Sequence, residues 1–192
     1  MSGKPFNRCC RAAVSPQGEI YVADGYGNGC VHKFTPDGKF IKSWGQTGSG
    51  PGEFNVVHSV CCDADGWVYV ADRENHRIQV FDGEGRFQTE WHNLHRPCGL
   101  YMLGEKNPTF FVGELCQQIK TNHYPNLGPR LSILDHRGNL LARIGGKQFG
   151  LGLDEFTGPH GLATGSNGDL YVGEVAVAQW KFYWPDKPAP DA

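Results

Sequence analysis

The chain has 192 residues, with 18 Lys and Arg against 20 Asp and Glu, so its formal net charge is −2. This near balance argues against a dedicated nucleic-acid-binding protein, which normally carries a basic face. Apolar residues make up 39% of the chain, which excludes general disorder, and 27 glycines without a Gly-X-Y period exclude collagen. Many tight turns between short strands are expected instead.

The sequence shows neither a membrane-spanning segment nor a signal peptide. No apolar stretch is long enough to cross a bilayer, and the first six residues contain no apolar segment of a signal peptide. We therefore expect no membrane partner and a cytoplasmic location by default. The seven cysteines include no CxxC pair, so reduced and mostly buried thiols are expected.

A repeated unit runs through the chain, beginning at residues 6, 54, 94 and 156. Three of the copies align without a gap, and the copy at 94 fits with a two-residue insertion. The opening segments, in chain order, read FNRCCRAAVSPQGEIYVAD, FNVVHSVCCDADGWVYVAD, LHRPCGLYMLGEKNPTFFVGE and FTGPHGLATGSNGDLYVGE. Each segment reads as two short strands joined by a turn.

The second half of each unit adds two more predicted strands. A further apolar run follows in every unit, and a Gly turn and a closing strand follow in the first three. The apolar runs are Val31–Phe34, Ile78–Phe81, Leu131–Leu134 and Trp180–Phe182. Four strands joined by X-Gly turns predict an antiparallel meander, and a period of 40–50 residues is typical of a β-propeller blade. The fold class is therefore predicted to be all-β.

The repeat divides the chain into four blades of one propeller domain. Their ranges are residues 6–53, 54–93, 94–155 and 156–184, with a tail at 185–192. The fourth blade lacks its outer strand. One long insertion, residues 115–129, lies between strands of the third blade, and a loop of this length is either functional or poorly ordered.

Three motifs resemble those of a known family. They are DGYGN at residues 24–28, GPGEF at 50–54 and ADRENHRIQVF at 71–81. The units resemble NHL repeats and, more closely, peptidyl-α-hydroxyglycine α-amidating lyases and the bacterial six-bladed propeller proteins related to them. The resemblance covers residues 6–184 and implies a normally six-bladed ring, of which this chain supplies about four blades. The N-terminal blades of the ring are expected to be missing.

The resemblance implies a chemistry and a set of site residues. Family members cleave the C–N bond of a C-terminal α-hydroxyglycine, releasing a peptide amide and glyoxylate, with a zinc ion held by three histidines. Carried over by motif, the metal ligands are His58 and His160, and the catalytic residues are Tyr26, acting at the substrate hydroxyl, and Arg73, stabilising developing charge. The third histidine and a second arginine would lie on a missing blade. Calcium is not expected, because Gly161 stands where the lyases have an acidic residue.

Repeat positions support the same placement independently. His58 and His160 are both fifth in their units, and equivalent positions in a propeller converge on its axis, where two imidazoles could approach one zinc ion. The other two units carry Cys10 and Cys98 at this position, and either thiolate could complete the site. The alternative is that the histidines only line a wet channel.

Tyr26 and Arg73 occupy a second shared position, just after the strand that ends in Tyr-Val-Ala-Asp. A guanidinium there could bind a carboxylate or a developing oxyanion. The alternatives are a packing role for Tyr26 and surface ion pairs for Arg73. An acidic residue also ends each inner hairpin, and this column either attracts cations or caps turn amides. Its members are Asp24, Asp72, Glu114 and Glu174.

Two functions of different classes follow from the sequence. The first is metal-assisted, lyase-like cleavage of peptidyl-α-hydroxyglycine or a related small substrate. The second is a non-catalytic NHL module that binds a peptide or a protein on one propeller face. Nucleic acid is not an expected partner, and an open ring of four blades predicts self-association through uncovered apolar surface.

Overall fold

Three four-stranded antiparallel sheets follow one another along the chain in a computed structural model that describes residues 4–115, 127–146 and 149–189. A two-stranded antiparallel sheet comes after them. The strands of the four sheets, in chain order, are β1 (Arg11–Val14), β2 (Ile20–Asp24), β3 (Cys30–Phe34) and β4 (Phe40–Trp44); β7 (Val57–Cys62), β8 (Val68–Asp72), β9 (Arg77–Phe81) and β10 (Phe87–Trp91); β11 (Pro97–Leu103), β12 (Thr109–Glu114), β13 (Arg130–Leu134) and β14 (Leu140–Gly145); and β15 (Pro159–Thr164) and β16 (Leu170–Glu174). The prediction of an all-β fold built from propeller blades is confirmed.

Each sheet is a meander in which neighbours in the chain are neighbours in space. The turns between the first two strands place Gly18, Gly66 and Gly168 at matching positions with φ of 84°, 88° and 89°. Only glycine adopts this backbone conformation without strain, which explains why the repeat keeps it there. A short parallel pair, β5 (Gln46–Thr47) with β6 (Glu53–Phe54), joins the first two blades.

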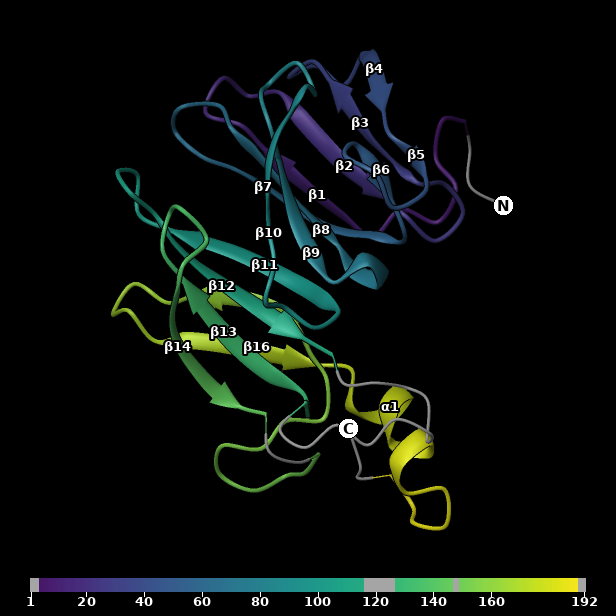
Figure 1. Cartoon of the computed structure of the whole chain (residues 1–192), viewed down its shortest axis with the longest axis vertical. Coiled ribbons are helices and arrows are strands. Elements are labelled where there is room, and N and C mark those ends of the chain that lie inside the picture. Colours follow the sequence, from purple (N-terminus) through teal and green to yellow (C-terminus); the bar gives the residue numbers. More distant parts are fainter. Residues whose placement is uncertain (1–3, 116–126, 147–148, 190–192) are drawn as a thin grey trace.

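The first strands of the four blades lie next to one another. Strand β1 packs against β7, β7 against β11 and β11 against β15. Figure 1 shows the blades succeeding one another along the long axis of the molecule, with the purple and blue strands at one end and the green and yellow strands at the other. This succession brings equivalent residues of different blades close together, as the repeat predicts.

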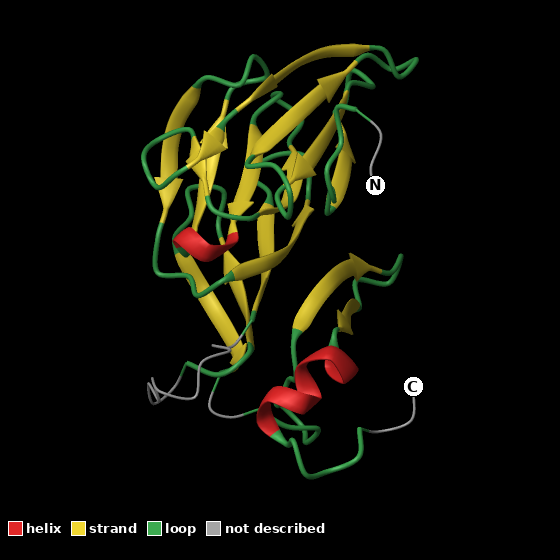
Figure 2. Cartoon of the chain, turned by 90° about the vertical axis from the view of Figure 1, so that its right-hand side faces the viewer, coloured by secondary structure: helices red, strands yellow, loops and turns green. Residues whose placement is uncertain are grey.

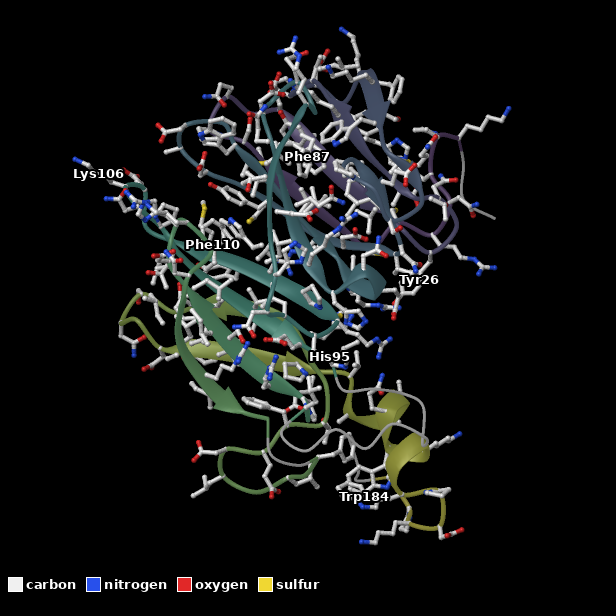
Figure 3. All side chains as sticks on the ribbon, viewed as in Figure 1. Tyr26, Phe87, His95, Lys106, Phe110 and Trp184 are labelled. Atoms are coloured by element: carbon white, nitrogen blue, oxygen red, sulfur yellow. The ribbon has the colours of Figure 1, made fainter. Side chains whose placement is uncertain are left out.

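Apolar layers between the blades form the core. One layer, between blades one and two, contains Tyr21, Phe54, Val60 and Phe81. The next layer, between blades two and three, contains an aromatic group in which the Tyr69 ring lies 4.5 Å from Phe110 and 5.3 Å from Trp91, centroid to centroid. Phe110, labelled in Figure 3, is fully buried in this second layer. The core therefore fixes the spacing of the blades.

The acidic column caps backbone amides. In every unit its carboxylate accepts a hydrogen bond from the backbone N–H of the unit's second residue, at 2.5–2.8 Å. The four pairs are Asn7 to Asp24, Asn55 to Asp72, His95 to Glu114 and Thr157 to Glu174. Three of these acids are completely buried, and each holds the start of its blade against the end of the inner hairpin. Of the two interpretations of the column, amide capping is the one that the geometry favours.

The fourth unit departs from the prediction after β16. The expected strand at Trp180–Phe182 is instead part of a helix, α1 (Ala176–Tyr183), shown in red at the lower end of Figure 2. In the other units a turn segment separates the second and third strands, whereas here Ala176 follows Glu174 after one residue. Two alanines, Gln179 and Lys181 are the good helix formers in this run, whose other residues are Val177 and aromatic residues. The Trp180 ring is buried 4.2 Å from the ring of Trp184, centroid to centroid.

Other expectations fall partly outside the described residues. Most of the predicted insertion at 115–129, namely residues 116–126, belongs to the part of the chain that the structure does not describe, as does the end of the tail, residues 190–192. No helix among the described residues is long and apolar enough to cross a membrane.

Candidate metal and substrate site

Strand irregularities place three potential metal ligands on the innermost strands. The register shifts between Val57 and Ser59 in β7, between Pro97 and Gly99 in β11, and between Pro159 and Gly161 in β15. The skipped residues are His58, Cys98 and His160, the fifth residue of each unit. A bulge leaves its extra residue outside the ladder and redirects its side chain, and bulges are frequent next to functional sites.

These three side chains meet. One ligand atom from each of His58, Cys98 and His160 lies within 4.8 Å of the other two. The Cys98 Sγ is 3.2 Å from His58 Nδ1, and the rings of His58 and His160 are 4.7 Å apart, centroid to centroid, and nearly perpendicular. His58 and Cys98 are buried, with 3% and 1% of their surface exposed, and His160 is partly exposed. The cluster is thus closed on one side and open on the other.

Close backbone packing brings the blades to this spacing. A Cβ placed on Gly99 would lie 2.2 Å from the carbonyl oxygen of His160, which is far inside van der Waals contact. A Cβ on Gly25 would meet the Val57 carbonyl oxygen at 2.1 Å. Glycine at these two positions therefore allows neighbouring blades to approach closely beside the cluster.

Burial sets the protonation of the cluster. It lowers the pKa of His58 to about 4, with Arg73 and His160 adding to the effect and the Cys98 carbonyl opposing it. Burial also lowers the pKa of His160, helped by Arg73 and Arg11. Both imidazoles are consequently neutral near pH 7, which is the form that binds metals. Burial raises the pKa of Cys98 to about 12, so this thiol keeps its proton until a cation approaches.

One tautomer of His58 follows from its partners. Its Nδ1 lies 2.9 Å from the carbonyl oxygen of Cys98, and because a carbonyl only accepts, Nδ1 carries the proton. The Nε2 atom therefore has a free electron pair. It accepts a hydrogen bond from the Tyr26 hydroxyl at 3.2 Å, and this hydroxyl in turn accepts one from Arg73 Nη1 at 3.0 Å.

Tyr26 and Arg73 come from different blades, as the repeat position predicts. Tyr26 is in the loop after β2, and Arg73 begins a 3-10 helix, η1 (Arg73–Asn75), after β8. Figure 3 shows Tyr26 beside this helix. The guanidinium carbon lies 5.2 Å from the centre of the Tyr26 ring, within cation–π range. Tyr26 is half exposed, with 51% of its surface accessible.

Glu74 fixes the position of Arg73. Its carboxylate accepts from Arg73 Nε at 2.8 Å and from Arg96 Nη2 at 2.7 Å. Burial alone would raise the pKa of Glu74, but Arg96 and Arg73 hold it below its usual value. Sequence reasoning did not single out Glu74 or Arg96. Glu74 lies in the ADREN motif and Arg96 in the third unit, and the contact between them depends on how the two blades pack.

The other thiol at the fifth position does not join the cluster. Cys10 precedes β1, and its Sγ lies 3.9 Å from the carbonyl oxygen of Arg8. Among the described residues, the group able to hold a metal consists of His58, Cys98 and His160. The predicted ligands and catalytic residues, His58, His160, Tyr26 and Arg73, are thus brought together in one place, with Cys98 among them.

A buried Ser-His-Asp line lies elsewhere, in blade one. His32 Nδ1 is 2.6 Å from Ser43 Oγ, and its Nε2 is 3.0 Å from Asp24 Oδ2. His32 occupies the position that Gln79 holds in blade two, where the amide donates to Asp72 at 3.0 Å. This equivalence indicates that His32 belongs to the carboxylate network of the blade.

The donor set fits the zinc ion that the family resemblance implies. Two neutral imidazoles and a sulfur atom, all mutually within 4.8 Å, are ligands that borderline-soft zinc accepts. Three protein ligands leave a coordination position open, as catalytic zinc sites require. Calcium does not fit this cluster, because its three donors include no oxygen atom.

Comparison with known proteins assigns the family. A family model described as "6-bladed beta-propeller" matches residues 14–124. The chain belongs to the 6-bladed beta-propeller family. This propeller is 33% identical over 190 residues to peptidyl-glycine alpha-amidating monooxygenase B of Xenopus laevis, an alignment that covers 93% of the chain and 21% of that protein. The chain thus spans about a fifth of the relative's length.

Two further relatives are a lyase and an NHL repeat protein. Peptidyl-alpha-hydroxyglycine alpha-amidating lyase 1 of Drosophila melanogaster is 29% identical to the propeller, over 91% of the chain and 34% of the lyase. Human NHL repeat-containing protein 3 is 41% identical over 91 residues, which are 46% of the chain and 26% of that protein. Among solved structures, hydrazine synthase of Kuenenia stuttgartiensis superposes with a TM-score of 0.61 at 13% identity, covering 90% of the chain and 44% of that structure. This last likeness concerns the fold alone.

Proposed function

We propose that this propeller is a lyase-like enzyme that cleaves the C–N bond of a peptidyl-α-hydroxyglycine, or of a related small carbinolamide, with the help of a zinc ion. The observation that carries the proposal is the line of contacts from Arg73 through the Tyr26 hydroxyl to His58 Nε2, at 3.0 and 3.2 Å. These contacts join a cation, Arg73, a group that can transfer a proton, Tyr26, and a candidate metal ligand, His58, in one partly exposed site. The similarity to relatives that include a lyase supports the same reaction.

Zinc would be held by His58 and His160, and when bound it would polarise the oxygen atoms of the substrate. The protein's own groups would do the rest. Arg73, charged and only partly exposed beside Tyr26, would stabilise negative charge on the phenol oxygen or on the substrate. Tyr26 is half exposed, and its hydroxyl, beside His58, would meet a substrate that enters from the open side of the cluster.

The reaction balances without an oxidant or a second substrate. Reacting as the phenolate, Tyr26 would accept the proton of the substrate hydroxyl, the oxygen electrons would form the aldehyde C=O of glyoxylate, and the C–N electron pair would move to the amide nitrogen. Tyr26 would then pass the proton to that nitrogen, which restores the phenolate as the peptide amide leaves. Arg73, which donates a hydrogen bond to the Tyr26 oxygen, would hold that oxygen in place beside the substrate hydroxyl.

Glyoxylate release from N-benzoyl-α-hydroxyglycine tests the proposal. The zinc-loaded chain should release glyoxylate above the rate without protein, and His58→Ala and His160→Ala should each lose bound zinc and activity. His92→Ala is the matched control, because this histidine is exposed on the outer edge of blade two. A folded chain that retains stoichiometric zinc and releases no glyoxylate would contradict the lyase and leave the NHL interaction module as the function.

Self-association is proposed as a property of the same chain. Large apolar side chains are exposed on both the first and the last blades, with 53% of Phe40 and 60% of Tyr171 accessible. Surfaces of this kind pair with other protein when nothing covers them. Light scattering should give a mass above that of one chain, and a single monomer peak contradicts the proposal.

A further inference from the structure

The sulfur atom of Cys98 lies where a third metal ligand is needed. It is 3.2 Å from His58 Nδ1 and 3.5 Å from His58 Nε2, and one ligand atom each of His58, Cys98 and His160 falls within 4.8 Å of the others. Cys98 is 1% exposed, so neither solvent nor a bulky oxidant has ready access to it. Packing alone does not explain why a buried sulfur should face two imidazoles.

The backbone aims Cys98 in the same way as the two histidines. Each of the three is the extra residue of a bulge at the second position of an innermost strand, on three successive blades. Residues outside the ladder can turn toward the axis without losing strand hydrogen bonds. Gly99 then allows β11 to approach β15 until the two backbones nearly touch. Cys98 therefore belongs to one set with His58 and His160 by position as well as by distance.

Cys98 also prepares His58 for coordination. The Cys98 carbonyl accepts a hydrogen bond from His58 Nδ1 at 2.9 Å, so the Nε2 electron pair, to which the Tyr26 hydroxyl donates, is the one that a metal would take. Hydrogen bonding of the non-ligating nitrogen is the usual way in which proteins orient a metal-binding histidine. One residue thus provides both a sulfur donor and the carbonyl that fixes the imidazole.

We propose that Cys98 is the third protein ligand, so that the site is a His2Cys centre and not a three-histidine centre. A thiolate ligand favours zinc, cobalt or cadmium over manganese or calcium. It also lowers the net charge of the centre by one unit relative to three neutral histidines. The catalytic meaning of this centre rests on the proposed function, whereas the coordination itself rests on the geometry of the three side chains.

Cobalt substitution gives a readout that is independent of activity. The full chain loaded with Co²⁺ should show a near-ultraviolet sulfur-to-cobalt charge-transfer band and the visible bands of a tetrahedral ion. Cys98→Ser should abolish the charge-transfer band and weaken zinc binding by at least about tenfold, the size of effect that even outer groups of zinc sites produce. Cys98→His should recover metal binding without the sulfur band. Cys9→Ser, at an exposed thiol, should leave the spectrum unchanged.

Each outcome decides one of the two proposals. A charge-transfer band that disappears in Cys98→Ser, without glyoxylate release by the zinc form, supports the His2Cys centre and overturns the lyase. Glyoxylate release by a chain whose cobalt form lacks the band overturns the role of Cys98 and leaves the lyase standing. A band that persists in Cys98→Ser and disappears in Cys10→Ser assigns the sulfur to Cys10 and likewise overturns the proposal.

Discussion

Arg73 donates a hydrogen bond of 3.0 Å to the hydroxyl of Tyr26, although 47 residues separate the two in the chain. The contact crosses from blade two to blade one and lies directly beside the His58 imidazole. It exists because both residues follow the second strand of their units. Residues at the same repeat position of two blades therefore lie together in one site.

Tyr26→Phe should remove most of the activity and leave the fold intact. The phenylalanine ring keeps the packing against His58 and Arg73 but has no phenol oxygen to take the substrate proton. We expect glyoxylate release to fall by about 100-fold or more, which is typical for the loss of a general acid or base. Tyr171→Phe, at an exposed tyrosine far along the chain, is the control and should not change the rate. Equal rates for Tyr26→Phe and the parent would remove Tyr26 from the mechanism.

Glu74→Gln should lower the free energy of unfolding. It should also make that free energy less sensitive to a fall in pH. The change leaves the Arg73 and Arg96 guanidinium groups without their shared carboxylate, and Arg96 is 7% exposed. Because Glu74 itself is 28% exposed, solvent screens part of the effect, and we expect a loss of about 1–2 kcal/mol in urea unfolding. Glu84→Gln, which removes a more exposed carboxylate, should cost less.

The sign of the pH effect follows from the lowered pKa of Glu74 in the folded state. Stabilisation of this kind is complete above the pKa of the unfolded chain, about 4.3, and is lost as the pH falls through the folded value. The parent should therefore lose more stability than Glu74→Gln between neutral pH and acid. Parallel stability curves for the two proteins would contradict this.

Val56→Asn should be tolerated or stabilising, because Val56 has φ of 61°, a conformation that strains a β-branched residue. Asparagine adopts this conformation more easily, and the free energy of unfolding should stay equal or rise by up to about 1 kcal/mol. The same substitution at Val14, in extended strand β1 and 65% exposed, should be destabilising. Urea unfolding of the two variants checks the difference, and equal losses would argue against strain at Val56.

Gly99→Ala should force β11 and β15 apart, since its Cβ would lie 2.2 Å from the His160 carbonyl oxygen. We expect a loss of about 1–3 kcal/mol in stability, the usual cost of overpacking, together with weaker zinc binding. Gly161→Ala is a matched control, because Gly161 follows His160 as Gly99 follows Cys98 and a Cβ there meets no atom within 4 Å. Similar effects of the two substitutions would show that spacing at Gly99 does not matter.

His32→Gln should preserve the stability of blade one, because Gln79 fills the same position in blade two and donates to Asp72. His32→Ala should cost about 1–3 kcal/mol, since the buried Asp24 then loses one of its donors. Thermal unfolding of both variants measures the contrast. If glutamine and alanine were equally destabilising, the proposed equivalence of the two blades would be wrong.

The repeat made much of the fold and of the site predictable. Because the units align almost without gaps, the fifth residues His58 and His160 could be expected to meet, and so could Tyr26 and Arg73. The choice between Cys10 and Cys98 could not be made, since it depends on a bulge that forms at Cys98 in β11, whereas Cys10 lies before the start of β1. The repeat pattern in the sequence does not predict where a strand shifts its register by one residue.

In the fourth unit the repeat predicted an element that does not form. Its similarity to the other units predicted a third strand at Trp180–Phe182, but the chain enters α1 there. The turn segment that separates the second and third strands of the other units is missing here, and this local difference outweighed the repeat. The Glu74–Arg96 pair was unpredictable for another reason, because it forms between blades from residues that share no repeat position.

The bulges have a consequence for how such propellers diversify. A side chain that stands outside the strand ladder can be exchanged without removing any hydrogen bond that holds the sheet together. Histidine, cysteine or a residue with no affinity for metals can then occupy the same place on an unchanged blade. The scaffold thus separates the residues that maintain its architecture from those that determine its chemistry, and a new reactivity at the axis requires a change of side chain alone.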